Sequence, residues 1–162
     1  MSILKVDTIN EKTTGNGVQI AGHIIQTVFV NDSTEYSNNT TSFTDSNLTG
    51  TITPKSASSK ILITSQLATD AAVGSTLSVR LLRGSTVLQE ETYWNYLTVQ
   101  NSSDYILMRQ PHFYLDTPST TSAITYKWQL KRLSGTASPA YISYDDSNGQ
   151  TDSQIILQEI AQ

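Results

Sequence analysis

The sequence contains no cysteine, has little charge and has no long apolar run. Without cysteine, the 162 residues have neither a disulfide framework nor thiolate chemistry. Charged residues make up 15% of the chain, against about 25% in an average soluble domain. No run approaches the ~18 apolar residues of a membrane-spanning helix, and the N-terminus lacks an apolar signal core. We therefore expect neither membrane insertion nor a small disulfide-rich secreted domain.

The apolar content is low as well. Residues of the set AVILMFWYC make up 37% of the chain, whereas about 45–50% is usual for a similar set. Serine and threonine fill much of the difference, because threonine suits a solvated sheet face and serine suits turns. One β-rich domain with a short arm fits this length and composition. The thin supply of apolar residues also favours a head that associates with copies of itself.

The charge balance argues against a nucleic-acid partner. The formal net charge is −4, whereas a protein that neutralises phosphates needs a basic face. Lys127, Lys131 and Arg132 lie close together in the sequence, and a solvated strand face explains them adequately.

Short segments that alternate apolar and polar residues recur from Ile24 to the end of the chain. The clearest alternation surrounds Trp128, which we predict to lie in the core. Pro111 interrupts one long segment, so that segment is expected to be bent or at a sheet edge. Residues 31–47 are polar and are predicted to form a loop. The expected strands are 24–30, 48–53, 60–67, 77–81, 87–90, 105–115, 124–131, 140–144 and 154–160.

This pattern predicts an all-β fold, an antiparallel β-sandwich of the jelly-roll type, over residues 23–162. Residues 1–22 are predicted to be an N-terminal β-arm that attaches the head to something else. A short hairpin of this kind buries too little apolar surface to be stable alone, so it must pair with another copy or a different protein. The apolar arm residues expected to dock are Leu4, Val6, Ile9, Val18 and Ile20.

Several stretches of the chain resemble short virion proteins of marine bacteriophages. Residues 53–63 (TPKSASSKILI) match the start of one of their strands, and FYLDTP at 113–118, followed by TSAITYK at 121–127, is similar to a second motif. The ending SQIILQEI at 153–160 resembles their last strand, which usually closes with Glu-Ile. The opening LKVDTI at 4–9 is similar to the start of many phage fibre proteins. The resemblance covers residues 1–22 and 50–162.

The resemblance implies a homotrimer with a jelly-roll head like those of the complement and tumour-necrosis-factor proteins. It implies a place in the virion and a second virion protein, of the tail or the capsid, that holds the arm. Residues 31–47 match nothing in this family.

The residues offer no set for catalysis. His23 and His112 are the only histidines, and neither lies in a nucleophile elbow or at a metal-binding spacing. We expect them to be structural or exposed, and we expect a protein that is not an enzyme and needs no cofactor. The acidic pair Asp145-Asp146 lies in a Ser-Asn-Gly turn, which explains it without glycosidase chemistry.

Two weaker site hypotheses remain. Oxygen ligands for a hard cation such as calcium are offered by Asp145, Asp146, Asn148 and Asp152, although the distal glutamate of a calcium loop is missing. The aromatic residues Tyr93, Trp94 and Tyr96 lie beside polar groups. They are expected to pack a subunit interface or the core, with contact to a glycan as the alternative.

The sequence therefore favours a non-enzymatic bacteriophage virion protein, a trimeric fibre or knob anchored by its arm, with host surface polysaccharide as a candidate partner. The alternative is a capsid decoration protein that stabilises the particle and touches no receptor. A polysaccharide hydrolase is the third class, and the missing catalytic set disfavours it.

Overall fold

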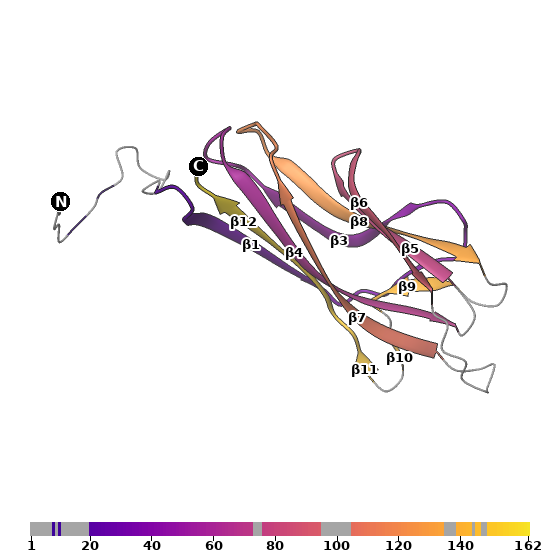
Figure 1. Ribbon diagram of the computed structural model, residues 1–162. Helices are drawn as coiled ribbons and strands as arrows, with labels where there is room; N and C mark the ends of the chain where they lie inside the picture. The colour runs from indigo at the N-terminus through magenta and orange to yellow at the C-terminus, as the bar shows by residue number, and fades with distance from the viewer. Residues whose placement is uncertain are drawn as a thin grey trace.

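The computed structural model describes residues 8, 10, 20–72, 76–94, 105–134, 139–143, 145–146 and 149–162. All regular structure among these residues is β, and every strand pair is antiparallel. Two sheets pack face to face (Figure 1), which confirms the predicted β-sandwich. A search of the described residues finds no helix long and apolar enough to cross a membrane.

Two sheets and one small hairpin account for all the strands described. The first sheet consists of β1 (Ile24–Asp32), β12 (Ser153–Ile160), β4 (Lys60–Ala72), β7 (Tyr105–Asp116), β9 (Ala140–Ile142) and β2 (Tyr36–Asn38). The second sheet consists of β3 (Thr44–Ile52), β8 (Ile124–Ser134), β5 (Thr76–Arg83) and β6 (Thr86–Trp94). The hairpin joins β10 (Asp145–Asp146) to β11 (Gly149–Gln150).

The order of the long strands is that of a jelly roll. β4 pairs with β12 and then β9 along one edge, and with β7 along the other. If the eight long strands are numbered along the chain, the two sheets read 1-8-3-6 and 2-7-4-5. This interleaving of early and late strands gives the two Greek keys of the fold. The last strand therefore lies in the middle of the first sheet, between β1 and β4, and closes it.

The core lies between the sheets and follows the alternation of the strands. In β12, buried and half-buried residues alternate without exception along the strand. Trp128 is buried as predicted, and its Nε1 donates to Ser65 Oγ at 3.0 Å across the sandwich. A side chain at Gly50 would crowd Leu157, because a Cβ there would lie 3.1 Å from Leu157 Cδ1. Glycine at this position thus lets β3 pack closely against β12 of the opposite sheet.

The prediction that residues 31–47 form a loop is wrong. β2 occupies Tyr36–Asn38, and β3 begins at Thr44, four residues before the expected start. Small polar side chains concealed these strands, because Ser46 takes a buried position where an apolar residue was expected. Buried Asn38 stabilises the segment: its Nδ2 donates to Leu130 O at 2.7 Å and to Ser42 O at 2.8 Å.

The other expected segments are found, most of them with longer bounds, whereas the segment expected at 140–144 is the shorter β9 (Ala140–Ile142). β4 extends to residue 72 and β6 to residue 94, beyond the clear apolar alternation of each segment. The hairpin between β5 and β6 turns at Gly84, whose positive φ of 58° suits glycine. β7, which contains Pro111, pairs only with β4 among the described strands. The expectation of a sheet edge at this proline is confirmed.

Two buried carboxylates, Glu159 and Asp116, accept hydrogen bonds from other segments of the chain and lie in the stretches 153–160 and 113–118 discussed above. Glu159, near the end of β12, accepts hydrogen bonds from the backbone N–H of Lys55 at 2.8 Å and of Ser56 at 3.3 Å, and from the Gln26 amide. Glu159 therefore connects the end of β12 to the turn that precedes β4.

At the end of β7, Asp116 plays the same role for the second motif. It accepts from Arg83 at 2.8 Å and from the Tyr126 hydroxyl at 2.6 Å. Burial and then this hydrogen bond raise the pKa of the Tyr126 phenol far above its ordinary value. Tyr126 thus stays a hydrogen-bond donor at any physiological pH.

Candidate functional site

The outer face of the first sheet carries the most exposed apolar surface of the described chain. Its exposed members are Phe113 (65% exposed), Phe29 (57%), Ile24 (53%) and Leu115 (51%). Half-buried apolar residues lie between them. We call this set the apolar face; it consists of Ile24, Phe29, Leu62, Phe113, Leu115, Ile156 and Ile160.

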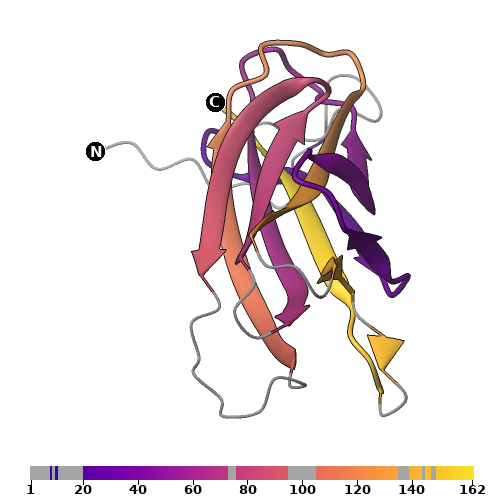
Figure 2. The same cartoon turned by 90° about the vertical axis from the view of Figure 1, so that its right-hand side faces the viewer.

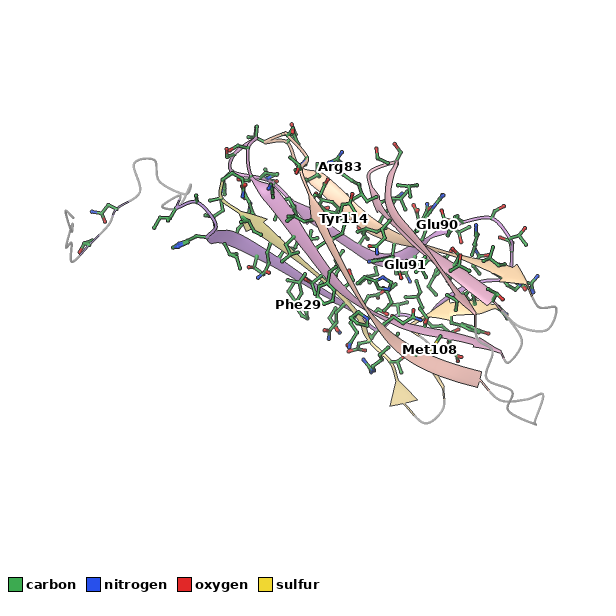
Figure 3. The ribbon with its side chains drawn as sticks, in the orientation of Figure 1. Phe29, Arg83, Glu90, Glu91, Met108 and Tyr114 are labelled. Atoms are coloured by element: carbon green, nitrogen blue, oxygen red, sulfur yellow. The ribbon has the colours of Figure 1, made fainter. Side chains whose placement is uncertain are left out.

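Strand register makes these residues neighbours. Phe29 pairs with Ile156, Ile156 with Thr64, and Thr64 with Phe113, so one row crosses β1, β12, β4 and β7. Strands lie about 4.8 Å apart, which puts the two phenylalanines at opposite ends of a row about 14 Å long. Figure 3 shows Phe29 projecting from the first sheet on the side away from the second sheet.

The adjacent rows extend the apolar face along the strands. Leu62 and Leu115 are paired in the next row. Beyond it, Ile24 pairs with Ile160 at the start of β1, with a bulge in β1 before the next pair. These rows place the apolar residues in one continuous band, where a solvated face would carry charged residues.

The apolar face contains no carboxylate. The outward positions of β1, β12, β4 and β7 in these rows are filled by apolar residues, threonine, glutamine, asparagine and Lys60. The chain as a whole carries a net charge of −4, so its acidic residues lie elsewhere. Apolar residues interspersed with polar ones, with one lysine and no carboxylate, make a surface of little charge, and depletion of charged residues is typical of the centre of protein–protein interfaces.

The outer face of the second sheet is different. Lys127 Nζ lies 2.7 Å from Asp45 Oδ2, and Lys131 Nζ lies 3.5 Å from Glu90 Oε1. The hydrogen bond from Lys127 is the largest cause that lowers the pKa of Asp45 below its usual range, followed by that from Gln129.

Phe43 packs on this same surface, between two cations. Its ring centroid lies 4.0 Å from the Arg80 guanidinium and 4.2 Å from the Lys131 ammonium. We call this set the polar face; it consists of Phe43, Asp45, Arg80, Glu90, Lys127, Gln129 and Lys131. Lys127 and Lys131 lie on this outer face as predicted, but each is half-buried and paired with a carboxylate. Arg132 is half-buried, and its backbone N–H donates to Thr40 O at 3.0 Å.

The root of the predicted arm meets the end of the chain. Gly22 N donates to Ala161 O at 2.8 Å, and Ala161 N donates to His23 O at 2.9 Å. Ile20 is 44% exposed. The other predicted docking residues, Leu4, Val6, Ile9 and Val18, lie outside the described residues.

For most of the aromatic residues predicted to form an interface and the acidic residues predicted to bind a cation, the structure does not describe the side chain. Tyr93 and Trp94 belong to β6 by their backbone, whereas Tyr96 is outside the described residues. Their predicted role in an interface, in the core or in glycan contact stays a prediction.

For the cation hypothesis, Asp145 and Asp146 form β10, Asn148 is outside the described residues, and Asp152 accepts from Asn31 Nδ2 at 2.9 Å. In the described part of the chain, no three His, Asp or Glu side chains are grouped so that they could hold a metal ion. Calcium binding by the four oxygen-bearing residues stays a prediction.

The two histidines differ in environment. His23 is exposed at the arm root. The His112 side chain is 2% exposed, and its ring centroid lies 4.5 Å from that of Trp128. The sequence predicted a structural or an exposed role for both histidines and did not say which of them is buried. Alternation with Phe113 and Leu115 predicts the opposite, because apolar residues of a strand are expected inward, so the sequence held no signal for the burial of His112.

No protein-family model matches the chain, and no curated protein matches it. Among solved structures, it is similar to a chain of infectious bursal disease virus, Gx strain, with 12% sequence identity and a TM-score of 0.42. The match covers 98% of this chain and 42% of that one. The fold assignment above therefore rests on this chain's own strand order and register.

Proposed function

We propose that the protein is a non-enzymatic structural component of a bacteriophage virion, a homotrimeric fibre or knob held on the particle by residues 1–22. The motif resemblance supports the virion setting. The apolar face supports self-association and is the observation that carries the proposal. The work of such a protein is assembly and contact, with host surface polysaccharide as the candidate ligand of the assembled head.

The size of the apolar face fits an interface between copies. A fully exposed phenylalanine presents about 200 Å², so Phe29 and Phe113 together leave roughly 240 Å² open. Burying that area is worth about 6 kcal/mol per copy at ~25 cal/mol per Å². This gain is comparable to the free-energy cost of association, estimated at about 4–15 kcal/mol. Burial of the remaining apolar residues and contacts of the surrounding polar residues add to the gain.

A second copy of the chain is the occupant that the composition favours. Identical copies that meet through the same surface would bring like charges together. The apolar face carries almost no charge, so a second copy can approach it without this repulsion. A closed cyclic arrangement covers one such face on every copy, as a trimer requires. Three equal surfaces would then add weak contacts to a repetitive glycan by avidity.

The oligomeric state tests the proposal directly. Light scattering of the purified protein should give three times the chain mass of 17.8 kDa. A monomer at micromolar concentration would contradict the trimer.

Removal of residues 1–22 should abolish incorporation into the particle and leave the head folded by circular dichroism. A truncated head that unfolds would instead make the arm part of the core.

Adsorption to host cells separates an appendage from a decoration protein. The appendage should bind cells in a form that soluble host polysaccharide competes away. Incorporation into particles without any cell binding would support decoration instead.

A further inference from the structure

β6 and β7 follow one another along the same side of the sandwich but belong to different sheets (Figure 2). In the described pairings, β6 pairs only with β5, and β7 only with β4. Side chains bridge this edge between the sheets. Arg83 reaches Asp116 at 2.8 Å, and Glu91 Oε1 lies 3.6 Å from His112 Nδ1.

His112 is enclosed at this edge by groups from three other strands. The Trp128 ring of β8 lies against it at an interplanar angle of 52°, and Ser65 of β4 is its register partner. Among the described residues, the charged group that faces it is Glu91 of β6, whose side chain is 37% exposed. Burial lowers the pKa of His112, and the Glu91 carboxylate offsets this only in part. The imidazole is therefore neutral in the closed sandwich at neutral pH.

Next to this histidine, β7 is paired on one side only, because β4 is its one partner among the described strands. Pro111 precedes the histidine and has no N–H to donate to a second neighbouring strand. Phe113 follows it and, by the alternation of a strand, projects from the opposite side of β7 onto the apolar face. A movement of β7 at residue 112 therefore moves the apolar face as well.

We propose that residues 111–115 of β7 are an acid-sensitive latch, in which protonation of His112 releases this stretch from the sandwich edge and displaces Phe113 and Leu115 from the self-association face. The latch deepens the proposed function, because it regulates the same face. The Arg83–Asp116 ion pair contains no imidazole and keeps the end of β7 in place, so the opening is local.

The direction follows from proton linkage. In the closed state His112 binds its proton less tightly than in the open state, where water solvates it and its pKa returns to about 6.5. The closed state is therefore fully favoured above that value and is lost as the pH falls through the lowered pKa of the closed state. Acid should open the latch and weaken assembly together.

Hydrogen exchange and sedimentation of the full chain test this at about pH 7.5 and about pH 5. In the wild type, exchange of the 105–116 peptide, corrected for its intrinsic pH dependence, should be faster at the lower pH, because protonation of His112 favours the open state. The association constant should fall in parallel. Exchange of the 153–160 peptide should stay slow, because β12 lies inside the sheet.

Three variants make the test specific. His112→Phe keeps an aromatic ring against Trp128 and cannot take a proton, so its exchange and assembly should no longer respond to acid. Glu91→Gln removes the carboxylate that raises the pKa of His112, so the transition should move to lower pH. His23→Gln, at the exposed histidine, should behave as the wild type does.

An acid response of His112→Phe equal to that of the wild type overturns the latch. If that variant does not fold, an unmoved transition in Glu91→Gln overturns it. A wild type that is monomeric at both pH values contradicts the proposed function and not the latch. In that case, faster exchange of the 105–116 peptide at the lower pH supports the opening of β7, and unchanged exchange contradicts it.

Discussion

The outer faces of the two sheets have the same backbone alternation and opposite chemistry. On the polar face, cations and carboxylates pair within the chain, and Phe43 packs between Arg80 and Lys131. On the apolar face, Phe29 and Phe113 are more than half exposed. The first surface satisfies its own groups, whereas the second leaves apolar area in contact with water. The difference indicates which side of the head another molecule covers.

The largest expected effect comes from the two exposed phenylalanines. Phe29→Ser with Phe113→Ser should weaken association by about 100-fold for each residue, because each loses roughly 3 kcal/mol of apolar burial. Sedimentation velocity should show monomers at concentrations where the wild type is trimeric. The head should keep its melting temperature, since both side chains are exposed in the single chain.

Val87→Ser is the matched control for this pair. Val87 is 44% exposed on β6 of the second sheet. Equal dissociation of this variant would remove the distinction between the two faces.

The same comparison can be made within one strand, β12. Glu159→Ala should destabilise the fold by about 3 kcal/mol, because the backbone N–H groups of Lys55 and Ser56 lose their buried acceptor. Ile156→Ser, on the outward side, should weaken association and change the unfolding free energy by less than about 1 kcal/mol. Urea unfolding at low protein concentration and sedimentation measure the two quantities separately. If Glu159→Ala proved as stable as the wild type, the Glu159 contacts would have no stabilising role.

Phe43→Ala tests whether the polar face has only an internal role. It should lower the unfolding free energy by about 1–2 kcal/mol, since two cation–π contacts of ~0.5–1 kcal/mol each are lost. Association should be unchanged in sedimentation. A loss of trimer from this variant would show that the polar face also takes part in assembly.

The smallest effect is expected at the ion pair of the polar face. Lys127→Met should cost no more than about 1 kcal/mol, because the pair is solvent-exposed and screened. The pKa of Asp45 should rise toward its ordinary value when its principal donor is removed, which NMR titration measures directly. In the wild type, the stabilisation linked to Asp45 is present above about pH 4 and is lost as the pH falls through the lowered pKa. An unmoved Asp45 titration in Lys127→Met would contradict this assignment.

Much of the fold could be predicted from local pattern. Strict alternation around Trp128 and in β12 predicted strands and inward residues correctly, because a strand sends successive side chains to opposite faces. Pro111 predicted the edge position of β7, since it cannot donate to a second neighbour. The prediction failed between residues 31 and 47, where Ser46 and Asn38 are buried by hydrogen bonds that connect distant segments.

The candidate site was only partly within reach of sequence reasoning. The low apolar content suggested self-association but not its location. Phe29 and Phe113 lie 84 positions apart, and only the register through β12 and β4 brings them into one row.

The sequence by itself determined the strand periodicity, the lack of cysteine chemistry and the polar character of most outward positions, because these depend on residue type and local spacing. Tertiary structure alone decided the order of strands, the burial of His112 and the placement of Phe29 and Phe113 in one row of the first sheet. That placement depends on which late strand inserts between early ones, and the insertion is settled by burial of the whole core.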